Sequence, residues 1–351
     1  MNIKKVAGLA VVALASVSVL AACRSNSTGS SSKTDLKVAI ITDTGGVNDH
    51  SFNQSAWEGL QAWGKDNGLS KGKGFNYFQS NSASDYTTNF QSALDGGYKL
   101  MFGIGFSLQS ATQEAAKNNP SNNFVIIDSV IDGQKNVASA VFGDNEAAYL
   151  AGVAAAKTTK TKHIGFIGGG DKGNAVILAF ETGFKAGVAS IDKSIKVDVQ
   201  YAGSFTDAGI GKTIANTMYA SGADVVYQCA GGVGDGAFQA AKALNETKNE
   251  ADKVWLIGVD RDQESYGAYT SKDGKSANFT LVSTVKKVGK VVQDISDQTK
   301  DGKFPGGKTE TYNLKNGGVD LAKDNATDST WSAVQTAKQA IIDGKVTVAS
   351  K

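Results

Sequence analysis

Short apolar runs alternate with helical patterns through the chain from residue 36 onward. Each run is followed by a polar loop and a segment with apolar residues at helical spacing, such as Phe52, Ala56 and Leu60. Strands that alternate with crossover helices form parallel sheets covered on both faces. In this first series the predicted strands are 36–42, 75–79, 98–105 and 123–128, and the run 137–144 precedes an Ala-rich helix at 145–157.

The same alternation occurs a second time further along the chain. The pattern predicts helices at 177–191 and 208–220 between the new apolar runs. Because the two series are similar in length, we expect an α/β protein of two doubly wound parallel-sheet lobes with related topology. The predicted strands of the second series are 163–169, 196–203, 223–230 and 254–260.

The last part of the chain completes both lobes. We expect a strand at 278–285, a helix from about residue 287, a hairpin at 312–321 on an Asn-Gly-Gly turn and a helix at 331–342. This order predicts an N-terminal lobe of 36–144 and 287–306 and a C-terminal lobe of 145–286 and 307–351. Crossovers near 144, 286 and 306 would form the hinge.

The first 22 residues have the features of a lipoprotein signal peptide. Lys4 and Lys5 precede an apolar run at 6–20 that is too short for a good transmembrane helix. Leu-Ala-Ala-Cys at 20–23 resembles a bacterial lipobox, although an ordinary secretory signal with a chance cysteine is the alternative. We expect residues 23–35 to be a lipidated Cys23 and a Ser-rich flexible tether, which would hold the body on the extracytoplasmic face of the cell membrane.

The charge and the His and Cys counts exclude several kinds of site. The net formal charge is only +2, too small for a basic nucleic-acid surface. Two His and two Cys argue against a multi-histidine metal site and a disulfide scaffold. We therefore expect no nucleic-acid partner, no metal and no cofactor.

Polar and aromatic residues gather just after the predicted strands. Open α/β sheets bind ligands beyond the carboxyl ends of their strands. Helix capping or turn chemistry explains any one of these residues by itself, but their joint placement favours a polar ligand between the lobes. They are Asp43, Asp128, Phe205, the glycine-rich run 231–236, Asp260 and Lys286.

No catalytic motif is present. The run 165–172 lacks the Gly-Lys-Ser/Thr of a phosphate-binding loop, and 231–236 fails the GxGxxG register. That second run can still offer backbone amides to a ligand at a helix N-terminus, or it can be only a tight turn. His163 opens a predicted strand and is interpreted as structural, whereas His50 lies in the first loop, where ligand contact and solvent exposure are both open. We find no closely spaced catalytic pair and expect a protein that is not an enzyme.

The segment 43–60 is the most informative of the chain. Ser51 with Gln54 predicts a capping box and a helix that starts near Phe52. The segment resembles the basic membrane protein family, the purine-nucleoside receptor lipoproteins of bacterial ABC importers, through Asp-x-Gly followed by Ser-Phe-Asn-Gln-Ser-Ala-Trp-Glu-Gly. His50 stands where that family more often has Lys or Arg. The resemblance continues in order through 164–169, 180–187, 228–242, 257–263 and 281–287.

The resemblance implies a type I periplasmic-binding-protein fold in which two lobes clamp a purine nucleoside such as adenosine, guanosine or inosine. It implies a monomer that works with the permease and ATPase subunits of an ABC importer. The implied ligand-binding residues pair by role: Phe52 and Phe205 sandwich the base, Asn53 and Asp128 bind its edge, Asp260 and Lys286 hold the ribose hydroxyls, Gly231 offers backbone polarity, and Asp43 lies beside the base or orders its loop.

The chemistry of these side chains fits an uncharged ligand. A carboxylate such as Asp260 only accepts hydrogen bonds, so it can bind two neighbouring ribose hydroxyls. Three acids around one lysine favour a nucleoside over a nucleotide, because a phosphate site carries more Arg or Lys. Three alternatives stay open: a binding protein for a sugar or another small polar ligand, a nucleoside-processing enzyme, and a transcription-regulator core of the same fold.

Overall fold

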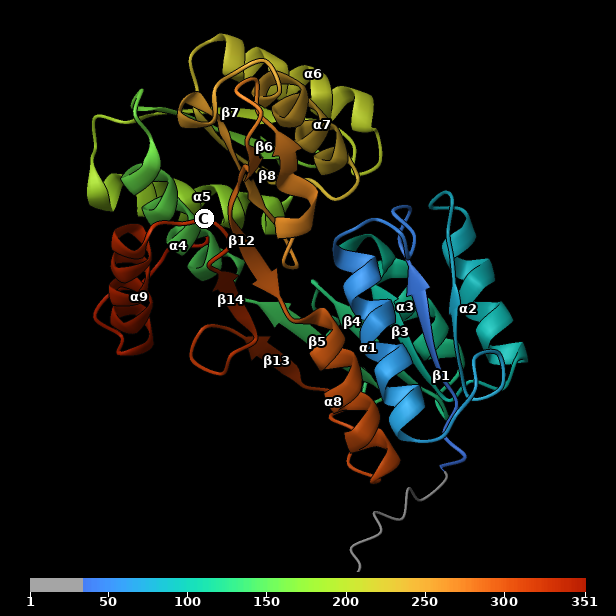
Figure 1. Ribbon diagram of the computed structural model, residues 1–351. Coiled ribbons are helices and arrows are strands. Elements are labelled where there is room, and N and C mark those ends of the chain that lie inside the picture. Colours follow the sequence, from blue (N-terminus) through green and yellow to red (C-terminus); the bar gives the residue numbers. More distant parts are fainter. Residues whose placement is uncertain (1–33) are drawn as a thin grey trace, which may run out of the picture. The chain divides into compact units, whose positions relative to one another are not determined.

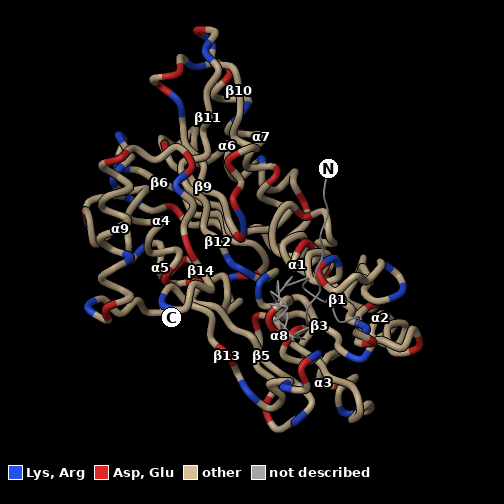
Figure 2. The backbone as a smooth tube through the Cα atoms, turned by 60° about the horizontal axis from the view of Figure 1, so that its bottom comes forward, with Lys and Arg blue, Asp and Glu red and all other residues tan. Residues whose placement is uncertain are grey.

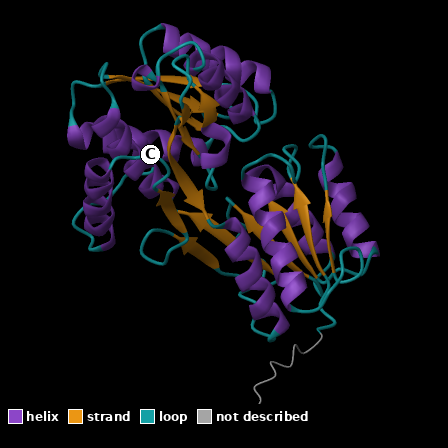
Figure 3. Ribbon diagram, viewed as in Figure 1, coloured by secondary structure: helices purple, strands orange, loops and turns teal. Residues whose placement is uncertain are grey.

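The computed structural model describes residues 34–351. The predicted signal peptide, Cys23 and most of the predicted tether lie outside the described residues. Nearly all the strands expected from the sequence are present, and they form two six-stranded sheets (Figures 1 and 3).

The first sheet is wholly parallel and has the strand order β13-β5-β4-β3-β1-β2. Its strands run in register, with Ile40 of β1 opposite Phe102 of β3. The order 2-1-3-4-5 within it reverses direction between β1 and β3, which makes a topological switch point. The strands are β1 (Val38–Thr42), β2 (Phe75–Phe78), β3 (Leu100–Ile104), β4 (Asn123–Ile127), β5 (Val137–Phe142) and β13 (Thr309–Tyr312).

The second sheet repeats this arrangement, with the order β14-β12-β9-β8-β6-β7. Only its edge strand β14 is antiparallel to its neighbour. The corresponding switch point lies between β6 and β8, so the expectation of two lobes with related topology is confirmed. The strands are β6 (His163–Gly168), β7 (Lys196–Tyr201), β8 (Val225–Cys229), β9 (Trp255–Gly258), β12 (Thr280–Lys286) and β14 (Val319–Ala322).

Helices cover both faces of each sheet because alternate strand residues point to opposite sides. In β1, Val38 and Ile40 pack with α1 and α8, whereas Ala39 and Ile41 pack with α2 and α3. In the second lobe, α4, α5 and α9 share one core cluster, and α6 and α7 share the other. The helices are α1 (Phe52–Asp66), α2 (Asp85–Asp95), α3 (Gln109–Asn118), α4 (Asp144–Thr158), α5 (Ala175–Ile191), α6 (Ala208–Ala220), α7 (Val233–Asn245), α8 (Val288–Lys300) and α9 (Asp328–Ile342).

The chain passes between the sheets at three places, and one of them differs from the expectation. The passages after β5 and after β12 lie near residues 144 and 286, as predicted. The predicted hairpin at 312–321 is wrong, because β13 pairs with β5 in the first sheet and β14 pairs with β12 in the second. The Asn-Gly-Gly turn therefore joins the two sheets, and the third passage lies at 313–318 and not near 306.

The helices α1 and α8 touch through glycines. A Cβ atom on Gly59 would overlap the backbone of Gly289, and one on Gly289 would lie 2.6 Å from the carbonyl oxygen of Ser55. These two glycines let α1, which follows β1, lie directly against α8, which follows the passage near residue 286. The packing fixes α8 against the first lobe.

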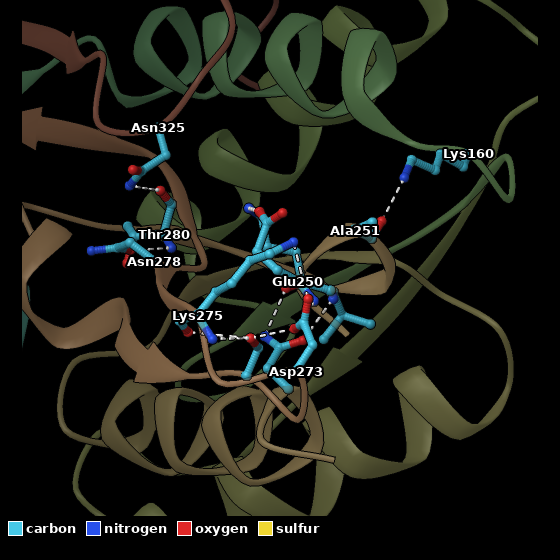
Figure 4. A network of polar contacts seen from close by, with 12 residues as sticks. Lys160, Glu250, Ala251, Asp273, Lys275, Asn278, Thr280 and Asn325 are labelled. Atoms are coloured by element: carbon cyan, nitrogen blue, oxygen red, sulfur yellow. Dashed lines mark hydrogen bonds and ion pairs between the residues drawn. The ribbon is translucent and has the colours of Figure 1, made fainter. Parts of the chain in front are cut away.

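A small antiparallel ribbon of β10 (Ala268–Thr270) and β11 (Ser276–Asn278) projects from the second lobe, and the sequence did not predict it. Polar contacts join the turn of this ribbon to the segment around Glu250 of the same chain (Figure 4). Asp273 accepts from the backbone N–H of Glu250 and from the hydroxyl of Ser271, and its carboxylate pairs with Lys275. Ser271, Lys275 and Glu250 hold the pKa of Asp273 below its ordinary value. The ribbon is thus fixed well away from the carboxyl ends of the strands.

Basic and acidic residues are interspersed along the described chain, without a long stretch of one sign (Figure 2). Among residues 34–351, no helix has the length and apolar character needed to cross a bilayer.

Candidate functional site

A cavity lies where the carboxyl ends of the two sheets face each other. About 580 Å³ within and at the mouth of this cavity, part of it open to solvent, is free of protein atoms. All eight residues that the sequence singled out for ligand binding line it: Asp43, Phe52, Asn53, Asp128, Phe205, Gly231, Asp260 and Lys286. Sequence positions as far apart as 43 and 286 therefore meet in one space, as the strand-end rule predicted.

The loop after β1 forms one wall of the cavity. Asp43 accepts hydrogen bonds from the backbone N–H of Gly45 at 2.8 Å and from the side-chain amide of Asn53 at 2.7 Å. The predicted capping box is wrong: Ser51 donates its hydroxyl to Asp260, and Gln54 bonds to Glu58. Asp49 caps α1 instead, accepting from the backbone N–H groups of Asn53 and Gln54.

Lys286 lies at the centre of the polar wall and is almost completely buried. Its Nζ is 2.6 Å from Asp128 and 3.2 Å from Asp144, which begins α4. The same nitrogen lies 5.1 Å from the ring centre of Phe52 and 4.9 Å from that of Phe142. Aromatic faces attract cations, so carboxylates and rings together hold the lysine.

Asp128 follows β4 directly and Asp260 is the second residue after β9, and both have left-handed backbones, with φ of 63° and 67°. This conformation costs a non-glycine residue of the order of 1 kcal/mol and is found mostly at functional sites. In each case the chain turns sharply at the end of its strand. The turn leaves the carboxylate in the cavity wall.

Burial shifts the acid–base properties of this cluster. It raises the pKa of Asp260 to about 6, against the opposing effects of Lys286 and the Ser51 hydroxyl. Burial likewise raises the pKa of Asp43 to about 6 and that of Asp144 to about 7. Burial alone would lower the pKa of Lys286, but the attraction of Asp128, Asp144 and Asp260 is greater, and its pKa lies above the ordinary value. The charged form of each acid is thus poorly solvated.

Phe205 occupies a place that glycine residues make for it. A Cβ on Gly169 or Gly170 would overlap the phenyl ring of Phe205. The ring centre of Phe106, which follows β3, lies 6.1 Å away at an interplanar angle of 60°. The glycine run after β6, unsuited to a phosphate loop in its sequence, therefore has a packing role: it seats an aromatic ring in the cavity wall.

The second glycine-rich run begins with Gly231, which has a φ of 56° and lines the cavity. The helix α7 starts two residues later, at Val233. Further along, a Cβ on Gly236 would overlap the backbone carbonyl of Ala208, so this glycine lets α6 and α7 pack closely. The run is therefore a tight turn and also brings backbone to the cavity.

Two acceptor atoms in the cavity wall are buried without a hydrogen-bond partner. They are Oδ1 of Asn53 and Oδ1 of Asp128. Buried polar atoms are nearly always paired in folded proteins, and an unpaired one costs about 1–3 kcal/mol. A ligand that brings N–H or O–H donors to these two oxygens would remove that cost.

The sequence reasoning missed several residues of the wall. Phe106 follows β3, and Val176, Ile177 and Phe180 belong to the first turns of the helix after β6, so the same strand-end rule contained the signal for them. Asp49 and Asp144 gave no such signal, because an acid beside a helix start is ordinary capping chemistry. The other lining residues that were not predicted are Gly45, Gly105, Cys229, Ala230 and Val259.

The contacts of His163 and the burial of Cys229 indicate structural roles for these two residues. His163 opens β6 and pairs with Asp198 at 2.6 Å on the neighbouring strand. Burial raises the pKa of the Cys229 thiol well above its usual range, so this thiol is a poor nucleophile. Within residues 34–351, no group of three or more His, Cys, Asp or Glu is arranged to hold a metal ion.

Comparison with known proteins identifies the family. The family described as "ABC transporter substrate-binding protein PnrA-like" matches residues 36–351. The chain belongs to this family. It is 68% identical to the ABC transporter nucleoside-binding protein BmpA of Lactococcus lactis subsp. cremoris (strain MG1363), over 99% of both chains. It is also 32% identical to basic membrane protein D of Borreliella burgdorferi (strain JD1), over 94% of this chain and 92% of that protein. The resemblance inferred from segment 43–60 is confirmed.

Solved structures confirm the fold. An ABC transporter solute-binding protein from Aeropyrum pernix K1 matches with a TM-score of 0.77 at 23% identity, covering 90% of this chain and 94% of that one. A glucose-galactose binding protein, GanP from Geobacillus stearothermophilus, matches with a TM-score of 0.59 at 17% identity, over 84% and 99% of the two chains. The type I periplasmic-binding-protein fold is therefore present, and the protein is a substrate-binding protein of the ABC transporter class.

Proposed function

We propose that this protein captures a purine nucleoside between its two lobes and delivers it to the permease of an ABC importer. The observation that carries the proposal is the cavity wall, where four carboxylates and two unpaired acceptor oxygens stand beside aromatic rings. A nucleoside supplies what such a wall lacks, because its ribose brings hydroxyl donors and its flat base brings N–H donors together with a face that stacks on aromatic rings. The relative from Lactococcus lactis is a nucleoside-binding protein, which supports the same ligand class.

The proposed roles of the site residues follow from the polar atoms that their contacts within the protein leave unpaired. Oδ2 of Asp128 is paired with Lys286, so Oδ1 is available to an N–H donor on the base edge, together with Oδ1 of Asn53. Asp260 and Lys286 bind the ribose hydroxyls, and Asp43 orders the loop beside the base. Gly231 adds backbone polarity.

The aromatic residues supply a second, less directional part of the affinity. Phe52 and Phe205 enclose the base, with stacking worth about 1–3 kcal/mol per base. Charge-assisted hydrogen bonds that Asp260 accepts from the ribose hydroxyls add about 1.5–3 kcal/mol each. A ligand without the ribose hydroxyls forgoes the second contribution and leaves a buried charge unpaired.

The charge of the wall selects against phosphate. Among the lining residues, Asp43, Asp49, Asp128 and Asp260 face one cation, Lys286. A nucleotide would bring further negative charge into this buried space, where like charges repel strongly. The proposed substrate is therefore the nucleoside and not its phosphate ester.

The cellular setting proposed here follows from the family and from the first residues of the chain. Members of the family are extracytoplasmic substrate-binding proteins, and we propose that lipid on Cys23 anchors this one to the cell membrane as a monomer. Its partners would be the permease and ATPase subunits of the importer. The protein would bind and release its ligand unchanged.

A thermal-shift panel with the purified protein tests the ligand class. Adenosine, guanosine and inosine should raise the melting temperature, since a ligand at 100 times its Kd adds about 2.7 kcal/mol of stability. Ribose, glucose and adenosine monophosphate should not. Stabilisation by a sugar alone would replace the proposal with the sugar-binding alternative. Free base released on incubation with adenosine would replace it with an enzyme.

A further inference from the structure

A second set of contacts joins the two lobes at the edge of the site, outside the cavity wall. His50 of the first lobe places Nδ1 3.2 Å from Oδ1 of Asp235 on α7 of the second. Its ring also lies 5.0 Å from that of Tyr266, in the short 3₁₀ helix Glu264–Gly267. The side chains of His50 and Asp235 are 43% and 38% exposed, and none of the three residues lines the cavity.

The backbone of His50 is held by the second lobe as well. Nε2 of Gln263 donates to the carbonyl oxygen of His50 at 3.0 Å. Gln263 is itself a rigid anchor, because it is buried and its Oε1 accepts from the side chain of Gln228 and the N–H of Val259. The contact therefore ties the loop of one lobe to the interior of the other.

The loop around His50 thus contributes both to the cavity wall and to a contact outside it. His50 has a left-handed backbone, with a φ of 54°, which few non-glycine residues adopt. The residues beside it in the chain serve the site: Asp49 caps the helix that carries Phe52, and Ser51 donates to Asp260. The side chain of His50 contacts Asp235 and Tyr266, neither of which lines the cavity.

We propose that His50 and Asp235 form a latch that holds the lobes closed and sets how long the ligand stays, without touching it. The proposal rests on the proposed function for its ligand. In this architecture the lobes open and close about a hinge, and a contact between lobes exists only while they are closed. The latch therefore slows ligand release and leaves ligand entry nearly unchanged.

The groups around His50 favour this contact. Asp235 from α7 and Tyr266 from the 3₁₀ helix face the imidazole ring, and Asp49 is its neighbour in the loop. A hydrogen bond to a carboxylate is stronger than one between neutral groups, so the Asp235 side chain is the stronger of the two contacts across the lobes.

The chain offers a matched control. It contains only two histidines, and the second, His163, also pairs with an aspartate, Asp198. That pair joins β6 to β7 within one sheet, so opening of the lobes leaves it intact. A comparison of His50→Gln with His163→Gln separates the effect of a bridge between lobes from the general effect of losing a histidine–aspartate pair.

The test is the dissociation rate of adenosine, followed by stopped flow. His50→Gln and Asp235→Asn should each release adenosine about two- to five-fold faster than the wild type, the range expected for one partly exposed pair. His50→Lys, with a cation that can pair with Asp235, should keep slow release. His163→Gln should match the wild type. Equal rates for the wild type and His50→Gln would overturn the latch, as would an equal acceleration by His163→Gln.

A measurement without ligand separates this proposal from the one on which it rests. Small-angle X-ray scattering of the ligand-free protein should give a larger radius of gyration for His50→Gln than for the wild type, because more molecules are open. Equal radii would refute the latch even if adenosine binds. If no nucleoside binds the wild type, the proposed function fails, and the scattering result still decides on the latch.

Discussion

Replacing Asp260 with asparagine should change stability and binding in opposite directions. The carboxylate is buried beside Lys286 and accepts the hydroxyl of Ser51, and burial raises its pKa from 3.8 to about 6. In the ligand-free protein the charge of this residue therefore lowers the free energy of unfolding at neutral pH. With ligand present, we expect it to bind the ribose hydroxyls.

The shift of about two pKa units corresponds to roughly 3 kcal/mol. This figure already includes the attraction of Lys286 and the hydrogen bond of Ser51, both of which lower the pKa. An asparagine of the same shape retains an oxygen for Ser51 but carries no charge to desolvate. We expect Asp260→Asn to raise the free energy of unfolding by about 1–3 kcal/mol at pH 7, since the amide pairs imperfectly.

The sign of the pH dependence is fixed by the direction of the shift. The folded protein binds the proton of Asp260 more tightly than the unfolded chain does, so the destabilisation is absent below pH 4 and complete above pH 6. The stability gain of Asp260→Asn should therefore vanish near pH 4 and grow between pH 4 and pH 6. In the same variant, the Kd for adenosine should be at least tenfold higher than in the wild type.

Urea unfolding at pH 4, 5, 6 and 7, with calorimetric titration of adenosine at pH 7, measures both effects. Asp224→Asn is a suitable control, because Asp224 accepts hydrogen bonds from Thr159, Lys160 and Thr161 outside the cavity. It should lower the unfolding free energy and leave the Kd unchanged. If Asp260→Asn changed the free energy of unfolding by the same amount at pH 7 as at pH 4, the electrostatic reasoning would be refuted.

Three further predictions concern the base, the hinge helices and the anchor. Phe205→Ala should raise the Kd for adenosine at least tenfold by calorimetry, and an unchanged Kd would remove the ring from the site. Gly59→Ala should lower the free energy of unfolding by about 1–3 kcal/mol, because its Cβ meets the backbone of Gly289; a variant as stable as the wild type in urea would contradict this. Cys23→Ser should release the protein from the membrane fraction, and unchanged retention on fractionation would count against a lipid anchor.

The sequence predicts the strands and the position of the cavity well because both depend on strong, regular signals. Buried parallel strands are continuous apolar runs, and their carboxyl ends must meet at one edge of a sheet. Asp43, Asp128 and Asp260 could therefore be placed together from their positions alone. The aromatic partner Phe205 and the lysine followed from the same rule.

Local signals failed where a distant partner competes for the same group. Ser51 looks like a helix cap, yet its hydroxyl is taken by Asp260, 209 positions away, and Asp49 caps the helix. The Asn-Gly-Gly turn near 316 looks like a hairpin, yet the strands on its two sides pair in different sheets. Asp144 was missed because nothing local shows that the end of β12 brings Lys286 beside it.

The central claim is that carboxylates and rings from both lobes enclose a neutral base and its pentose. A crystal structure of the protein with guanosine tests it most directly. We predict the purine between Phe52 and Phe205, with the ribose hydroxyls on Asp260 and Lys286. Guanosine bound elsewhere, or crystals grown in saturating guanosine with none in the cavity, would contradict the claim.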